Sequence, residues 1–76
     1  MRQLIIQVPK GQGKAVLDLA KSYNGANLAQ FEANNNDREI DVVIVNISNR
    51  EVEKFLGELG NLSKVHIIVS VNVLEP

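Results

Sequence analysis

Apolar and polar residues alternate along the first segment of the chain, residues 2–9. Leu4, Ile6 and Val8 fall on one side of an extended backbone, because successive side chains of a strand point to opposite faces. Pro9 has no N–H group to donate to a neighbouring strand, so we expect the strand to end there. The pattern predicts a strand with one well-defined core face.

Two later segments repeat their apolar residues at helical spacing. The first covers residues 14–23, and the Asn24-Gly25 pair after it is a common helix stop. Ser48 and Glu51 have the spacing of a capping box, which would open a second helix that ends near residues 60–61. The apolar stripe of the first helix is Val16, Leu17, Ala20 and Tyr23. The stripe of the second is Val52, Phe55, Leu56 and Leu59.

Three further segments are typical of strands. Residues 26–33 form a weak, polar strand that we place at a sheet edge. Residues 34–39 are rich in Asn and Asp, which tolerate positive φ, and they predict a hairpin turn. Residues 39–47 form the strongest strand, and apolar side chains on both of its faces favour a central position. Residues 64–75 alternate regularly and predict a long last strand.

The order strand, helix, strand, strand, helix, strand predicts an α+β fold. Two split βαβ units with right-handed crossovers give a four-stranded antiparallel sheet with two helices on one face. This is the ferredoxin-like βαββαβ plait, in which the first and third strands are central. We expect residues 1–76 to form a single domain of this kind, which suits the length of the chain.

In this fold the sheet face opposite the helices is open, and several aliphatic residues are expected on it. The third strand contributes two or three of Val43, Val45 and Ile47, but its register is ambiguous because both of its faces are apolar. Scattered surface aliphatics are ordinary, whereas a contiguous apolar patch marks an interface and a small core gains from association. We therefore predict a homo-oligomer formed through the sheet. The predicted interface residues are Ile5, Val43, Val45, His66, Ile68 and Ser70.

The composition argues against several classes of protein. With no cysteine and one histidine the chain has no disulfide and no thiolate ligand, and a structural zinc site is not expected. The net charge of −1 gives no broad attraction to nucleic acid. RNA-binding plaits stack bases on aromatic residues of their central strands, and the central strands expected here have none. No apolar run approaches the ~20 residues that cross a bilayer, so we expect a soluble, folded domain. The absence of cysteine is consistent with a reducing, cytoplasmic setting.

The stretch VPKGQGKAV, residues 8–16, joins the first strand to the first helix. It lacks the spacing and the hydroxyl residue of a P-loop, and it lacks the third glycine of a dinucleotide-binding fingerprint. Two interpretations stay open. The stretch is either a turn with solvated lysines or an anion site built on the free amides of the helix N-terminus. The candidate ligand-binding residues are Lys10, Gly11, Gly13 and Lys14.

Catalytic machinery is not evident in the sequence. His66 has no Ser, Cys or paired acid at a recognisable spacing to form a nucleophilic or acid–base site. Asp37, Glu39 and Asp41 would suit a cation, but a hairpin tip is exposed, and a solvated strand edge is the simpler interpretation. We therefore predict that the chain is not an enzyme and binds no metal and no cofactor.

Three stretches resemble one known module: RQLIIQVPKGQGKAVLDLA, DREIDVVIVNIS and VHIIVSVNVLEP. They look like the N-terminal cytosolic domain of the bacterial and archaeal membrane-protein family catalogued as domain of unknown function 389. The resemblance covers essentially the whole chain. It implies that the chain is a fragment of a longer protein, that a transmembrane domain follows Pro76, and that the fragment lies on the cytosolic side of the inner membrane.

Two functions follow from these observations. The first is a non-catalytic regulatory or assembly domain that oligomerises through the open sheet face and modulates an attached membrane domain, which the resemblance suggests acts in transport. The second is a sensor that binds an anionic or amino-acid-like ligand at the glycine corner. Amino-acid-binding and PII-like regulatory domains are similar in architecture and bind ligands near such a corner.

Overall fold

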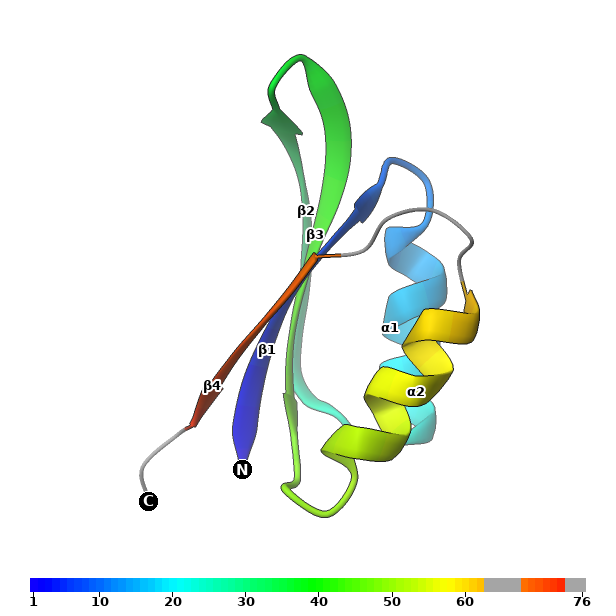
Figure 1. The fold of residues 1–76 in the computed structure, drawn as a ribbon, viewed down its shortest axis with the longest axis vertical. Helices are drawn as coiled ribbons and strands as arrows, with labels where there is room; N and C mark the ends of the chain where they lie inside the picture. The colour runs from blue at the N-terminus through cyan, green and yellow to red at the C-terminus, as the bar shows by residue number, and fades with distance from the viewer. Residues whose placement is uncertain (63–67, 74–76) are drawn as a thin grey trace.

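The computed structural model describes residues 1–62 and 68–73 of the chain. Figure 1 shows two layers, with both helices on one face of a twisted sheet. This confirms the predicted ferredoxin-like fold and the order of its elements. The elements are β1 (Arg2–Pro9), α1 (Gly13–Ser22), β2 (Ala26–Asn35), β3 (Arg38–Ile47), α2 (Val52–Leu62) and β4 (Ile68–Val73).

The strands lie in the order β2-β3-β1-β4, and every pair is antiparallel. β1 and β3 are central and β2 is at an edge, as predicted. A two-residue turn joins β2 to β3, since Asn35 pairs with Arg38. Asn36 and Asp37 in this turn have φ of 51° and 67°. Two residues in the left-handed region make the type I′ turn that matches the twist of a hairpin, so the turn chemistry predicted for this segment is confirmed.

The register between β1 and β3 decides which face of β3 is buried. Leu4 pairs with Val45, and Ile6 pairs with Val43, so these four side chains share the face that the helices cover. Val43, Val45 and Ile47 are completely buried there, and the prediction that they line the open face is wrong. The sequence of β3 alone is compatible with burial of either face. Pairing with β1 decides between them, because the apolar face of β1 has to lie under the helices.

α1 ends as its sequence predicts. Asn24 has φ of 59° and donates its N–H to the Lys21 carbonyl at 3.1 Å, while Gly25 donates to the Ala20 carbonyl at 2.8 Å. This pair of bonds is the Schellman motif, which satisfies carbonyls left free in the last turn. A Cβ atom on Gly25 would lie 2.7 Å from Val45 Cγ2, so glycine also allows the chain to pass close to the sheet.

α2 begins later than the proposed capping box requires. The Glu51 N–H donates to the backbone carbonyl of Ser48 at 2.9 Å, forming a turn, and the helix starts at Val52. In the described residues Ser48 and Glu51 make no side-chain hydrogen bond of the capping-box type, so that prediction is wrong. The apolar stripe is largely confirmed, because Val52, Phe55 and Leu59 are buried.

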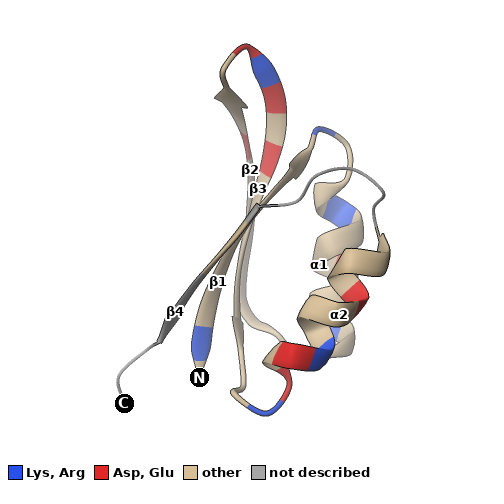
Figure 2. Cartoon of the chain, viewed as in Figure 1, with Lys and Arg blue, Asp and Glu red and all other residues tan. Residues whose placement is uncertain are grey.

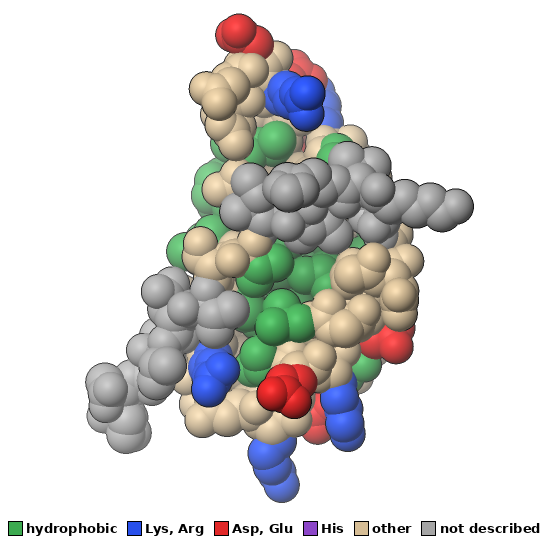
Figure 3. Space-filling view, in the orientation of Figure 1, with side chains coloured by type: hydrophobic (Ala, Val, Ile, Leu, Met, Phe, Trp, Pro, Cys, Tyr) green, Lys and Arg blue, Asp and Glu red, His purple; other side chains and the backbone are tan. Residues whose placement is uncertain are grey.

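The core lies between the sheet and the helices, where Figure 3 shows hydrophobic side chains gathered. Phe55 on α2 is completely buried. Its ring meets the ring of Tyr23 edge to face, with the centroids 5.9 Å apart at an interplanar angle of 80°. This contact joins the end of α1 to the middle of α2. Neither described helix is long and apolar enough to span a membrane.

Candidate functional site

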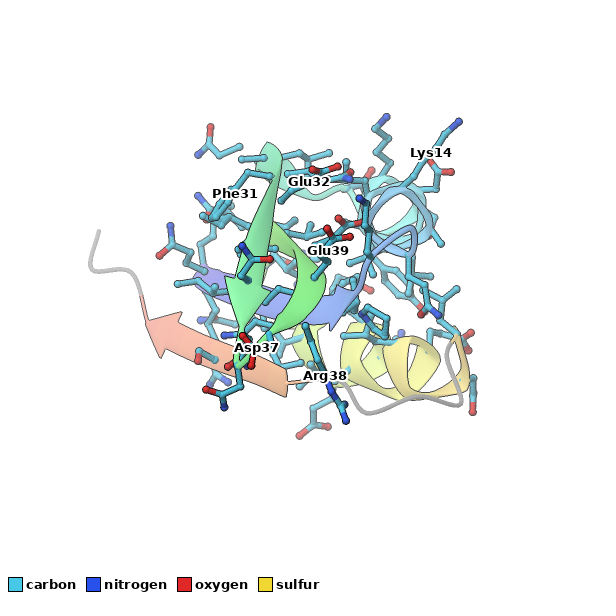
Figure 4. The ribbon with its side chains drawn as sticks, turned by 90° about the horizontal axis from the view of Figure 1, so that it is seen from above. Lys14, Phe31, Glu32, Asp37, Arg38 and Glu39 are labelled. Atoms are coloured by element: carbon cyan, nitrogen blue, oxygen red, sulfur yellow. The ribbon has the colours of Figure 1, made fainter. Side chains whose placement is uncertain are left out.

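The open face of the sheet is the first candidate site. Side chains on this face alternate with the buried ones, so the register places its members in rows across the strands. One row joins Ala29, Ile44, Ile5 and Ser70, and the next joins Phe31, Val42 and Gln7. Figure 4 shows Phe31 on the side of the sheet away from the helices, whereas Glu32 and Glu39 lie on the helix side. Phe31 is 48% exposed.

The structure brings together only part of the predicted interface. Ile5 lies on the open face and is half-buried, and Ser70 lies opposite it on β4 and is exposed. Ile68 pairs with Gln7 in the same register. His66 lies outside the described residues, and Val43 and Val45 belong to the core, as shown above.

Sequence reasoning missed three apolar residues of the open face. Val42 and Ile44 come from the central strand β3, and Phe31 comes from the edge strand β2. The strand register places these residues on the same face of the sheet as Ile5. The regular alternation of β1 was the signal that could have identified them. β3 is the central strand beside β1, so its residues have to share the two faces that β1 defines, one buried under the helices and one open.

A row of amide side chains borders these apolar rows. Asn46 on β3 pairs with Gln3 on β1 and with Ala26 on β2. Asn46 is only 7% exposed, and its buried Oδ1 atom has no hydrogen-bond partner among the residues that the structure describes. A buried acceptor without a donor costs free energy, so this position favours a group that could supply a donor.

The glycine corner between β1 and α1 is the second candidate site. Gly11 has φ of 95°, in the region that glycine adopts most easily, and the Gln12 N–H donates to the Pro9 carbonyl at 3.1 Å. The N–H groups of Gly11 and Gly13 both donate to Oδ2 of Asp41, each at 3.0 Å. The amides that were expected to meet an external anion therefore already bind a carboxylate of the chain itself.

Asp41 was placed on a solvated hairpin edge by the sequence, and that prediction is wrong. Its side chain is 4% exposed, because Asp41 pairs with Val8 on the face of the sheet that α1 covers. The packing is tight: a Cβ atom on Gly13 would lie 2.9 Å from the Asp41 Cβ and 2.8 Å from the Gln30 side chain. Glycine at position 13 lets the start of α1 approach the sheet closely enough to reach Asp41.

The two lysines of the corner do not act together. Lys10 Nζ lies 3.0 Å from Oε2 of Glu39, and both side chains are exposed. The hydrogen bond and the charge of Glu39 raise the pKa of Lys10, and Glu32 adds to this effect. Lys14, on the first turn of α1, is exposed and points outward in Figure 4. The corner therefore offers no convergent pair of cations.

A shallow cavity of about 260 Å³ lies beside this corner, between the corner and the β2–β3 hairpin. Its lining carries one ammonium group and two carboxylates, so it does not favour a simple anion. Within the described residues no cluster of three or more His, Cys, Asp or Glu side chains is placed to hold a metal ion. The lining residues are Lys10, Glu32, Ala33, Asn34 and Glu39.

Solved structures share the fold, although the sequences are far apart. No protein-family model and no curated protein matches the chain. A structure described as a PII-like signaling protein from Thermus thermophilus superposes with a TM-score of 0.75 at 13% identity, covering 93% of this chain and 82% of the other. A functionally unknown protein from Pediococcus pentosaceus gives 0.76 at 11% identity, covering 99% and 92%.

An acylphosphatase from Bacillus subtilis is also similar, with a TM-score of 0.60 at 22% identity, covering 99% of this chain and 90% of the other. At these identities the three likenesses establish the ferredoxin-like fold and leave function to be argued from the surface of this chain.

Proposed function

We propose that this chain is a non-catalytic regulatory or assembly domain that associates with a second copy of itself through the open face of its sheet. The observation that carries the proposal is the uncharged apolar face made by Phe31, Val42, Ile44 and Ile5. Figure 2 shows charged residues at the hairpin end of β2 and β3, at the start of β1, on the helices and in the connecting segments, while the middle of β1 and β3 carries none. Two such faces can meet without burying a charge.

The size of the face suits a modest dimer. Strands lie about 4.8 Å apart, and seven residues of a strand extend about 23 Å, so four strands present roughly 450 Å². Two faces packed together would bury on the order of 1,000 Å², which is near the lower limit of specific interfaces. We therefore expect a reversible dimer.

The test is an aspartate at the centre of the open face. Ile44→Asp should lower the mass measured by analytical ultracentrifugation across 10 µM to 1 mM, because association through this face would then bury a carboxylate. Leu62→Asp is the matched control, since Leu62 is an exposed apolar residue of α2 and its change should leave the mass unchanged. An Ile44→Asp variant with the wild-type mass, or a wild type that is monomeric at 1 mM, would refute the proposal.

We also propose that the domain modulates a membrane domain attached after Pro76, as the family resemblance implies. Sequencing the natural reading frame beyond this codon tests the attachment. Apolar runs of about 20 residues would support it, and a stop codon would contradict it. With the attachment established, deleting the domain should change the activity of the membrane part without abolishing its insertion.

The likeness to an acylphosphatase does not lead us to propose that activity here. A phosphatase has to hold a phosphate anion, and the helix N-terminus beside the glycine corner would be the natural place for one. In this chain the Gly11 and Gly13 amides donate to Asp41, whose negative charge would repel phosphate. An acyl phosphate hydrolysis assay should give the rate of the buffer alone, and turnover that depends on Lys10 would contradict this inference.

A ligand sensor is the second candidate, and the cavity beside the corner favours it. An ammonium and two carboxylates in the lining suit a small zwitterion such as an amino acid better than a phosphate. A thermal-shift panel of amino acids, nucleotides and inorganic anions should then give a shift with a zwitterion that Lys10→Ala and Glu32→Gln both reduce. Lys14→Ala serves as the control, because Lys14 does not line the cavity. A flat panel would remove this candidate.

A further inference from the structure

The outer edge of β2 is unusual for an edge strand. In the part of the chain that the structure describes, no strand pairs with that side of β2. β2 is ten residues long, and Glu32 is its single charged residue. It has no Lys, Arg or Pro, which are the residues that commonly prevent edge pairing. Its register shift lies between Ala26 and Ala29, so residues 29–35 pair with β3 without interruption and leave a regular edge.

The backbone groups on this edge can be assigned from the hairpin. Alternate residues of an antiparallel strand direct their N–H and C=O groups to opposite sides. Asn35 and Arg38 close the two-residue turn, so Asn35 faces β3, and Asn34, Glu32 and Gln30 face outward. One observed bond agrees with this assignment. Glu39, which pairs with Asn34, directs its carbonyl away from β2 and accepts the Lys10 N–H at 3.4 Å.

The sequence of this edge is nearly the same in both directions: residues 29–33 are Ala-Gln-Phe-Glu-Ala. We propose that β2 pairs antiparallel with β2 of a second copy about a two-fold axis at Phe31, so that two four-stranded sheets become one continuous sheet. Phe31 would then lie opposite its own copy. Gln30 would lie opposite Glu32 and exchange backbone hydrogen bonds with it, and Ala29 would lie opposite Ala33.

This register is favoured over its neighbours by charge and by packing. Phe31 would form a pair without mutual backbone bonds, in which side chains approach most closely, and its ring is 48% exposed in one copy. Gln30 opposite Glu32 pairs an amide with a carboxylate. An axis at Glu32 would instead place two carboxylates opposite each other, which is destabilising. The contact uses the edge backbone of β2, and Phe31 is the one residue that it shares with the open face proposed above.

A proline at an outward-facing position tests the edge. Glu32→Pro removes an N–H that the β3 ladder does not use. It is made in the Ile44→Asp background, where the open-face contact is removed, and it should raise the dimer dissociation constant at least tenfold over Ile44→Asp alone in analytical ultracentrifugation. Glu32→Gln keeps the N–H and should leave the dissociation constant of the same background unchanged. Circular dichroism checks that the proline variant is folded. A folded Glu32→Pro variant with the dissociation constant of Ile44→Asp alone would overturn the proposal.

Cysteine cross-linking tests the register and does not depend on the proline variant. The natural chain has no cysteine, so Ala29→Cys and Ala33→Cys each introduce a single thiol. With oxidised glutathione, the mixture of the two variants should form a covalent dimer at least tenfold faster than either variant alone. Equal rates would overturn the proposal. Ile44→Asp added to both variants should leave this cross-linking intact, which separates the edge contact from the open face.

Discussion

Replacing Asp41 with alanine removes the side-chain acceptor through which β3 binds the N–H groups of Gly11 and Gly13. In the native chain Oδ2 of Asp41 accepts the N–H groups of Gly11 and Gly13, each at 3.0 Å, and the side chain is 4% exposed. Alanine would leave both donors without a partner. The Gly13 amide is buried, so water cannot readily replace the carboxylate there, whereas the Gly11 amide is partly exposed and can be hydrated.

The expected loss follows from these two environments. An unsatisfied buried donor costs about 1–3 kcal/mol, and we assign the upper part of this range to Gly13 and the lower part to Gly11. The sum is about 3 kcal/mol. A domain of this length has a free energy of unfolding of roughly 4–11 kcal/mol. With a urea m-value of about 1 kcal/mol/M, Asp41→Ala should lower the unfolding midpoint by about 3 M, or leave the chain unfolded.

Urea unfolding followed by far-ultraviolet circular dichroism measures this effect. Asp41→Asn keeps an acceptor but loses the charge, so its loss should be smaller, about 1–2 kcal/mol. Glu39→Ala is the matched control, because Glu39 is a carboxylate on the same face of β3 but is exposed, and its midpoint should stay that of the wild type. A midpoint for Asp41→Ala within about 0.5 M of the wild type, or equal losses for Asp41→Ala and Glu39→Ala, would refute the reasoning.

Three further results are expected. Gly57→Ala should stabilise the domain by about 0.5–1 kcal/mol in thermal unfolding, because a Cβ atom there meets nothing within 4 Å and alanine favours the helix. Gly25→Ala should destabilise it in the same assay, since its Cβ would lie 2.7 Å from Val45; a stabilised variant would contradict the packing. Glu39→Gln should lower the pKa of Lys10 in an NMR titration of its side chain, because Glu39 raises that pKa. Any stabilisation from the pair should be lost as the pH rises through the raised pKa of Lys10.

The sequence predicted the fold well because local patterns and topology agree. The alternation in β1 and the helix stop at Asn24 each have a single local solution. The register of β3 has no single local solution, because residues Val42 to Val45 place apolar side chains on both faces of the strand. The structure resolves the ambiguity through a long-range pair, Leu4 with Val45, and strand pairing of this separation cannot be derived from one segment.

The glycine corner was found from the sequence, but its partner was not. Gly11 and Gly13 suggested free amides, and Asp41 was assigned to solvent because the hairpin around it is charged. Asp41 lies two residues before Val43 and therefore on the same face of β3. Once the register was known, this could have placed Asp41 on the face that the helices cover. The capping box failed for a different reason. The Phe55 N–H donates to the Glu51 carbonyl, so the helix begins after Glu51 and not after Ser48, whose carbonyl only closes the turn before it.

The central position of β1 has a consequence for how the protein is made. β1 leaves the ribosome before both of its neighbours in the sheet, β3 and β4. The β2–β3 hairpin can close locally, whereas the pairing of Arg2 with Val73 joins nearly the full length of the chain. Leu4, Ile6 and Val8 therefore stay uncovered during much of synthesis. This nascent strand is the part of the chain most in need of a chaperone, and slowing translation after β3 would lengthen the period in which it can aggregate.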